Sequence, residues 1–168
     1  ALGNGMEIRP IANMVNHETN EVFFDELHIP AENLIGEEGR GFRYILDGLN
    51  AERTLIAAEC IGDARWFVTR ASRYARERIV FDRPIGQNQG VAHPLAKCWA
   101  ELSAAELLTY KAARLYDQGL ECGAEANAAK YLGAEYGFDA CEAAVLAHGG
   151  MGYAKEYDVE RYMREAMI

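Results

Sequence analysis

Apolar side chains recur at every third or fourth position through most of this chain, which is the spacing that gives an α-helix one apolar face. The pattern predicts a first helix over residues 42–79, a second over 90–118 and a third over 124–148. Gly119 and a glycine cluster at 149–152 follow the second and third helices, where glycine commonly ends a helix. A fourth helix is expected to begin near Glu156 or Asp158 and to be still running at Ile168. Long helices with short connections indicate a mainly α fold, an antiparallel four-helix bundle.

The first forty residues have a different pattern, with short alternations of apolar and polar residues and many β-branched or aromatic side chains. Residues 7–11 and 21–29 are predicted to be β-strands, and residues 31–36 a turn-rich exit after Pro30. Because two strands alone are not stable, we expect them to belong to a larger sheet that the chain does not contain. The predicted domains are residues 1–40, the end of a β-domain, and residues 41–168, the helical bundle with its last helix truncated.

Glu52 interrupts an apolar stripe on the first predicted helix. Steps of three and four residues place it on one face with Ile45, Leu49, Ile56 and Cys60. A carboxylate buried in such a stripe loses solvation and becomes a better proton acceptor, as a general base requires. The structural alternative is an ion pair, either with Arg53 or with an arginine on a neighbouring helix. Glu59, two turns further along, is a similar but weaker candidate.

Two features near the predicted helix ends could bind an anion. The cluster Gly-Gly-Met-Gly at 149–152 allows the backbone to approach a phosphate or nucleotide closely, although a tight turn between helices would also need these glycines. The cluster is not a GxGxxG motif after a strand, which excludes a nicotinamide-type site. Arg78 ends a run of arginines and faces a loop with Pro84, where its guanidinium could bind a phosphate in bidentate fashion.

Composition and charge exclude several classes of protein. Half of the 168 residues are apolar, which argues against a disordered chain, and the formal net charge of −9 argues against a nucleic-acid binder. No apolar run approaches the roughly 20 residues of a membrane span. The four cysteines form no CxxC pair and the four histidines have no metal or triad spacing, so we expect reduced thiols in the core and no metal site.

The chain resembles the acyl-CoA dehydrogenases at several motifs, in the family's order. Residues 77–85, Glu-Arg-Ile-Val-Phe-Asp-Arg-Pro-Ile, together with Gln89 resemble the family's "R-x-x-F-G-x-P-I…Q" stretch. Residues 148–153, His-Gly-Gly-Met-Gly-Tyr, and the following Glu156, Glu160, Arg161 and Arg164 resemble its "H-G-G-x-G-Y…E-Y-x-V-E-R…R" signature. Residues 24–36 are similar to the end of its middle β-domain. The resemblance covers nearly the whole chain.

This resemblance implies a flavoenzyme that uses FAD to oxidise an acyl-CoA to a trans-2-enoyl-CoA, by removal of the α-proton and transfer of the β-hydride to the flavin. It also implies a C-terminal fragment, inactive alone, of an enzyme that assembles as a homo-oligomer, a dimer or tetramer, with an electron-transfer flavoprotein as acceptor. The family alternative is an acyl-CoA oxidase, and the non-enzymatic alternative is a binding or scaffold bundle. The expected compartment is the cytoplasm in a bacterium or the mitochondrial matrix in a eukaryote.

The resemblance also assigns roles to individual residues. In one group of the family the catalytic base lies on the first bundle helix before an arginine, which matches Glu52; other members carry it in a "Y-E-G-T" motif that would lie beyond Ile168. Asn50 and Arg53 would then lie near the substrate. The residues expected to contact FAD of a neighbouring subunit are Arg78, Phe81, Gln89, Gly149 and Gly150. Asp82 and Leu146 depart from the family, which usually has Gly and Gln at these positions.

Overall fold

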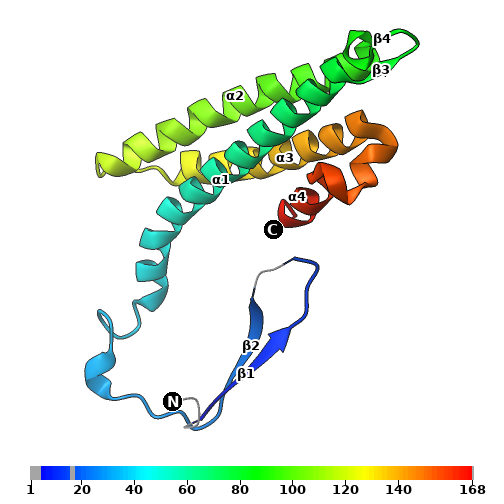
Figure 1. The fold of residues 1–168 in the computed structure, drawn as a ribbon. Helices are drawn as coiled ribbons and strands as arrows, with labels where there is room; N and C mark the ends of the chain where they lie inside the picture. Colours follow the sequence, from blue (N-terminus) through cyan, green and yellow to red (C-terminus); the bar gives the residue numbers. More distant parts are fainter. Residues whose placement is uncertain (1–4, 16–17, 168) are drawn as a thin grey trace. The chain divides into compact units, whose positions relative to one another are not determined.

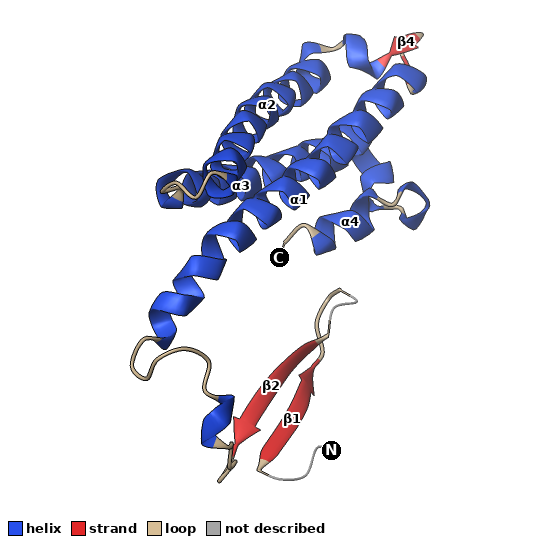
Figure 2. Cartoon of the chain, turned by 90° about the vertical axis from the view of Figure 1, so that its left-hand side faces the viewer, coloured by secondary structure: helices blue, strands red, loops and turns tan. Residues whose placement is uncertain are grey.

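The computed structural model describes residues 5–15 and 18–167, most of which are helical (Figure 1, Figure 2). The chain forms two compact units, Ala1–Leu46 and Asp47–Ile168, and the boundary between them falls inside the first helix, α1 (Gly41–Glu77). The predicted division into a β-domain and a bundle near residue 40 stays a prediction.

The first unit contains an antiparallel hairpin of β1 (Met6–Ile11) and β2 (Thr19–Phe24), in which Met6 pairs with Phe24 and Ile11 with Thr19. The predicted extent of the second strand, 21–29, is wrong. Phe24 pairs with Met6, the first residue of β1. One further backbone hydrogen bond joins the N–H of Asp25 to the carbonyl of Gly5, and Glu26 then turns the chain with a left-handed φ of 49°. A short 3-10 turn, η1 (Ala31–Asn33), lies where the turn-rich exit is predicted.

The second unit is the predicted helical bundle, which confirms the fold class. The helix α1 lies beside α2 (Gln89–Asp117) and α3 (Gly123–His148), and the short α4 (Val159–Glu165) packs against α3 (Figure 1, Figure 2). The first three helices begin and end within about two residues of the predicted bounds. The fourth helix follows two 3-10 turns, η3 (Gly149–Tyr153) and η4 (Lys155–Tyr157), and begins at Val159, one residue after the predicted start at Asp158. Its predicted extent is wrong, because the helix already ends at Glu165.

Small side chains let the bundle helices approach closely. A Cβ added to Gly133 of α3 would lie 3.2 Å from the backbone oxygen of Ala57 on α1, so only glycine fits without a shift. The buried residues of α1 recur at helical spacing and are mostly small: Ala57, Ile61, Ala64, Phe67, Ala71 and Ala75. The face of α1 that is buried is therefore the one whose small side chains allow α2 and α3 to approach closely.

A tight hairpin connects α1 to α2 where a loop is predicted. Its two-residue strands, β3 (Ile79–Val80) and β4 (Arg83–Pro84), pair antiparallel and are followed by the 3-10 turn η2 (Ile85–Gln87). The two residues at its tip, Phe81 and Asp82, both have positive φ, 53° and 60°. A two-residue connection with both φ values positive is a type I′ turn, which usually contains glycine or asparagine.

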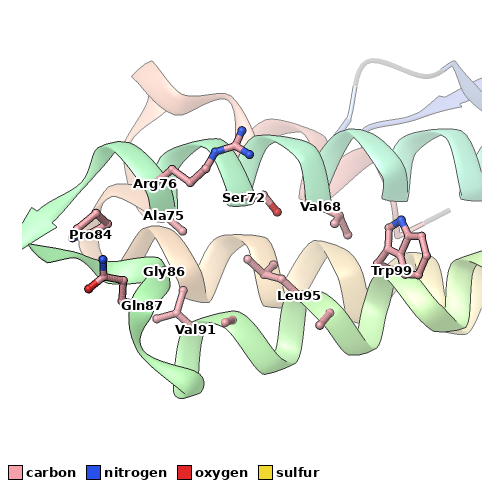
Figure 3. A pocket seen from close by; sticks show the side chains of 12 residues that line it. Val68, Ser72, Ala75, Arg76, Pro84, Gly86, Gln87, Val91, Leu95 and Trp99 are labelled. Carbon is pink, nitrogen blue, oxygen red and sulfur yellow. The ribbon is translucent and has the colours of Figure 1, made fainter.

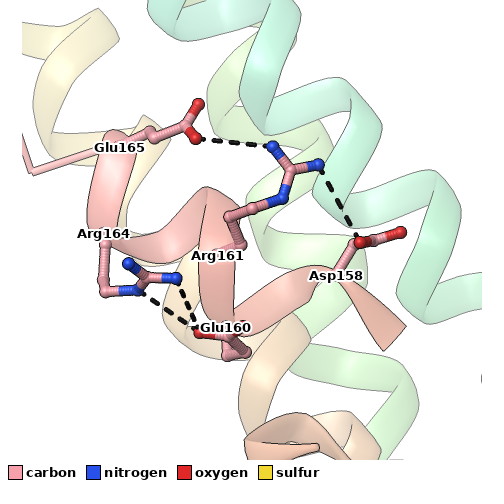
Figure 4. A network of polar contacts seen from close by, with 5 residues as sticks. All are labelled: Asp158, Glu160, Arg161, Arg164 and Glu165. Carbon is pink, nitrogen blue, oxygen red and sulfur yellow. Dashed lines mark hydrogen bonds and ion pairs between the residues drawn. The ribbon is translucent and has the colours of Figure 1, made fainter. Parts of the chain in front are cut away.

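The charged residues of the C-terminal motif pair with one another along α4 (Figure 4). Arg164 donates from Nε and Nη2 to Oε2 of Glu160, at 3.3 and 3.1 Å, and Arg161 lies 3.5 Å from Glu165 and 3.8 Å from Asp158. These pairs are one helical turn apart and partly exposed, so they support a short helix locally.

The four cysteines are free thiols, three of them buried, as predicted. Within the described ranges no group of His, Cys, Asp and Glu could hold a metal ion. No helix in the described part is both long and apolar enough to cross a bilayer.

Candidate functional site

Three of the residues expected to contact a nucleotide line one cleft. It lies where the end of α1, the β3–β4 hairpin and the end of α3 meet, and its volume is about 360 Å³. Arg78 lies on one side and Gly149 and Gly150 on the other. The remaining lining residues are Tyr74, Val80, Ile85, Leu146, Ala147, His148 and Met151.

The backbone of Arg78 is fixed at both of its polar groups. Its N–H donates to the carbonyl of Tyr74 (2.8 Å), which continues α1, and its carbonyl accepts from the N–H of Ile85 (2.9 Å), which closes the hairpin. The guanidinium is exposed and has no hydrogen-bond or ion-pair partner among the described residues. A positioned but unpaired guanidinium is suited to bind an anion in bidentate fashion.

The glycine turn on the other side of the cleft has a backbone that other residues would strain. Gly149 ends α3 with φ 58° and ψ −134°, a conformation that L side chains avoid. A Cβ on Gly150 would meet nothing within 4 Å, so this backbone faces open space, whereas a Cβ on Gly152 would lie 2.3 Å from the oxygen of Val145. The turn is thus packed on α3 at Gly152 and open toward the cleft at Gly150.

The walls of the cleft are apolar. Val80 and Ile85 come from the hairpin side, and Leu146 and Met151 from the helix side, with Leu146 70% exposed. Leu146 offers no polar group where the family usually has Gln. The potential donors among the lining residues are therefore the guanidinium of Arg78, the hydroxyl of Tyr74 and backbone N–H groups. This set fits a phosphate group joined to a flat apolar moiety, as in a nucleotide.

The inner wall of the cleft contains an aromatic cluster that the sequence analysis does not predict. His148 is only 3% exposed, its ring stacks on Tyr74 with 4.3 Å between centroids, and its Nδ1 lies 2.7 Å from the carbonyl oxygen of Ala144. The burial of His148 could have been predicted from the sequence, because residues 133, 137, 140, 144 and 148 have the spacing of one buried helix face.

Phe81 and Gln89 do not line this cleft. Phe81 is at the tip of the hairpin and 93% exposed, and Gln89 is the exposed first residue of α2. Their predicted contacts with a cofactor stay predictions.

The predicted catalytic and substrate residues lie near the other end of α1. Arg53 donates from Nη1 to Oδ1 of Asn50 (3.3 Å), and Asn50 lies close to Gly123 at the start of α3. Asn50 and Ala57 are seven residues apart, so both lie on the face toward the bundle. Glu52 is about 160° around the helix axis from Asn50 and is directed away from the bundle.

The expected burial of Glu52 is wrong in this structure. Its side chain is exposed, and it has no ion-pair partner in the described part of the chain, so the alternative of a structural ion pair with Arg53 is also not observed. The reason is that α3 packs on the face with Ala57, Ile61 and Ala64, not on the stripe of larger residues that contains Glu52. The role of Glu52 as a base stays a prediction.

Comparison with known proteins decides the family. A family model described as "Acyl-CoA dehydrogenase, C-terminal domain" matches residues 39–168. The chain belongs to the acyl-CoA dehydrogenase family. This confirms the resemblance found in the sequence motifs.

Individual members of the acyl-CoA dehydrogenase family are similar to this chain in sequence and in structure. An acyl-CoA dehydrogenase of Bacillus subtilis is 41% identical over 150 residues, which is 89% of this chain and 40% of that protein. The CarC subunit of the caffeyl-CoA reductase–Etf complex of Acetobacterium woodii is 35% identical over 92% of this chain and 41% of its own length. The structure of butyryl-CoA dehydrogenase from Megasphaera elsdenii superposes with a TM-score of 0.91 at 32% identity, covering 97% of this chain and 43% of that one.

The chain thus spans about two fifths of the length of the acyl-CoA dehydrogenases that it matches. FAD is the cofactor of this family, and the cleft between Arg78 and the glycine turn fits the diphosphate part of such a dinucleotide. The two groups of predicted site residues are far apart. Arg78 is 26 residues from Glu52 along α1, which corresponds to about 39 Å.

Two of the other cavities in the described part of the bundle lie away from this cleft. A groove of about 620 Å³ between α1 and α2 is lined mainly by apolar residues, including Val68, Leu95 and Trp99, with Arg76 at its edge (Figure 3). A smaller cavity of about 260 Å³ lies between α1, α3 and α4. It contains Cys60 and Asp63, and burial raises the pKa of both; the carboxylates of Glu59 and Glu165 raise the pKa of Asp63 further.

Proposed function

We propose that the protein containing this chain is an FAD-dependent acyl-CoA dehydrogenase, which oxidises an acyl-CoA to a trans-2-enoyl-CoA. The observation that carries the proposal is the cleft in which Arg78 faces Gly149 and Gly150, in a chain of this family. The relatives from Bacillus subtilis and Megasphaera elsdenii are named as dehydrogenases, which favours this activity over an oxidase or a non-catalytic scaffold.

In this proposal the cleft holds the adenosine diphosphate part of FAD. The guanidinium of Arg78 binds a phosphate through charge-assisted hydrogen bonds, which are stronger than neutral ones. The N–H of Gly149 donates to the carbonyl of Leu146, so the close approach of the phosphates is to the backbone of Gly150, where no Cβ keeps them away. Val80, Ile85, Leu146 and Met151 cover the apolar faces of the adenosine. When bound, FAD supplies the acceptor for the β-hydride of the substrate.

Glu52 is proposed as the base that removes the α-proton. Its exposed carboxylate has no partner among the described residues, so it is available to accept a proton from an acyl-CoA that lies against this face. Asn50 and Arg53, joined by a hydrogen bond, would contact the substrate near the same end of α1.

The separation of about 39 Å between Glu52 and Arg78 supports a shared cofactor. One flavin cannot reach from the nucleotide cleft to the base of the same chain. The cleft of one subunit would therefore hold the nucleotide end of a flavin that reacts in another subunit. Such an arrangement requires a homo-oligomer, either a dimer or a tetramer. An electron-transfer flavoprotein is the proposed acceptor, because the relative from Acetobacterium woodii is a subunit of an Etf complex.

The test uses the full-length protein purified with its cofactor. Anaerobic mixing with short, medium and long acyl-CoA thioesters should bleach the oxidised flavin absorbance and give an enoyl-CoA product with at least one substrate. A preparation without flavin, or a flavin that none of these thioesters reduces, would overturn the proposed function. Hydrogen peroxide formed in air at the rate of substrate oxidation would instead identify an oxidase.

A further inference from the structure

We infer that the aromatic stack of Tyr74, His148 and Tyr157 is a positioning device that sets the spacing between Arg78 and the glycine turn, and thereby the affinity for the cofactor's diphosphate. The inference rests on the proposed function, since it names residues that act on that cleft without contacting the phosphates. It assigns a role to His148 other than metal binding or acid–base chemistry.

The stack joins three segments that are far apart in the sequence. The rings of Tyr74 and His148 are nearly parallel, with centroids 4.3 Å apart and an angle of 23° between planes. Tyr157 packs edge-on against both, at 5.4 Å from Tyr74 and 5.6 Å from His148. Aromatic pairs at these distances contribute beyond the burial of their surface, so the cluster holds α1, the end of α3 and η4 together.

Each ring is tied directly to one side of the cleft. The carbonyl of Tyr74 accepts the backbone hydrogen bond of Arg78, so a shift of Tyr74 moves Arg78 with it. His148 directly precedes Gly149, and Tyr157 follows the turn, so the two rings flank the glycines at both ends. The stack therefore connects the segment that carries Arg78 with the glycine turn through side-chain contacts.

His148 itself is suited to packing rather than to ligand binding. Its Nδ1 is hydrogen-bonded to the carbonyl of Ala144, and with that proton on Nδ1 the other nitrogen, Nε2, has only a lone pair. Nε2 is buried and has no partner within the described residues. A ring nitrogen without solvent access does not contact a phosphate, so His148 acts through the position of its neighbours.

The first test compares His148→Leu and His148→Phe in the full-length enzyme by the dissociation constant of FAD. Leu removes the stack and should weaken binding by about threefold to tenfold, the range that an aromatic pair contributes. Phe keeps a ring against Tyr74 and should stay within about twofold of the wild type. The inference is overturned if both variants bind FAD like the wild type, or if Phe is as weak as Leu.

A double-mutant cycle separates positioning from general loss of stability. If the stack acts by placing Arg78, then His148→Leu should change FAD affinity by less than about twofold in an Arg78→Ala background. Full additivity of the two effects would contradict the inference. Leu102→Ala is the matched control: it removes a buried side chain of the α1–α2–α3 core away from the cleft and should lower stability without weakening FAD binding.

The same series distinguishes failure of the inference from failure of the proposed function. If the wild type carries no FAD, both proposals fall. If the wild type carries FAD but Arg78→Ala leaves its affinity unchanged, the cleft is not the nucleotide site, and the positioning role falls while the proposed activity stands. If Arg78→Ala weakens binding while His148→Leu and Tyr74→Leu do not, only the positioning role is overturned.

Discussion

The substitution Gly150→Ala separates folding from cofactor binding, because it adds one methyl group where the chain leaves open space. No heavy atom lies within 4 Å of the Cβ position, and Gly150 does not have a positive φ. Alanine should therefore fold as well as glycine and raise the free energy of unfolding by about 0.4–1 kcal/mol, since it restricts the unfolded chain.

The same methyl group should obstruct the phosphates in the cleft. If it prevents one N–H group from bonding a charged phosphate, the loss is about 1.5–3 kcal/mol, which corresponds to roughly 10- to 100-fold weaker FAD binding. The assay is FAD titration of the full-length apoenzyme by flavin fluorescence, combined with urea unfolding of the same sample. An unchanged dissociation constant with normal stability would refute the close approach of a ligand to Gly150.

Two glycines provide matched controls. Gly62 on α1 also has open space around its Cβ position, so Gly62→Ala should be tolerated and leave FAD affinity unchanged. Gly152→Ala should behave in the opposite way. Its Cβ would collide with the backbone oxygen of Val145 at 2.3 Å, so the loss should appear first in stability, by about 1–3 kcal/mol.

Three other substitutions test separate parts of the account. Glu52→Gln should slow flavin reduction by about 10²–10⁴-fold in single-turnover mixing with acyl-CoA, because the amide cannot accept the α-proton, while acyl-CoA binding persists. Asp82→Gly should raise the midpoint of urea unfolding, by about 1 kcal/mol in free energy, because residue 82 has φ 60° in a type I′ turn. Asp63→Asn should stabilise the protein at neutral pH by no more than about 0.5 kcal/mol, since burial of this carboxylate is only partial and solvent screens its charge. The pKa of Asp63 is raised above its ordinary value of 3.8, so its charge opposes folding above that pH. The gain in stability should therefore vanish as the pH falls below 3.8.

Each of these three predictions is contradicted by a specific result. Flavin reduction at the wild-type rate in Glu52→Gln would place the base elsewhere. An unchanged or lower unfolding midpoint in Asp82→Gly would show that Asp82 is not strained in the hairpin. A gain in Asp63→Asn that is the same at pH 3 and pH 7 would show that the charge of Asp63 is not its cause.

The ends of the second and third helices were accessible from the sequence because glycine follows each of them. The third helix is predicted over 124–148 and observed as Gly123–His148, followed by the glycine turn. The extent of the fourth helix was predicted less well, because the 3-10 turns η3 and η4 before it have no hydrophobic period that distinguishes them from an α-helix. The turn at Phe81 and Asp82 was not predictable either, since a bulky residue such as Phe81 rarely adopts a positive φ.

The buried face of α1 shows why the candidate site was only partly predictable. Large apolar residues such as Leu49 and Ile56 suggest one face, but the bundle buries the face with Ala57 and Ala64, because α3 approaches closely at Gly133. Hydrophobicity alone ranks the larger residues first, whereas close helix packing selects the smaller ones. The convergence of Arg78 with Gly149 and Gly150 followed from motifs, and the structure supplied the aromatic stack between them.

The central claim, that the cleft beside Arg78 holds the diphosphate of FAD, is tested most directly by the FAD dissociation constants of Arg78→Ala and Arg76→Ala in the full-length enzyme. Arg76 is an exposed arginine in the last turn of α1 that lines the groove between α1 and α2 instead of the cleft (Figure 3). Loss of the charge-assisted contact should weaken FAD binding by about 10- to 100-fold in Arg78→Ala, with Arg76→Ala unchanged. Equal affinity in the two variants would contradict the account.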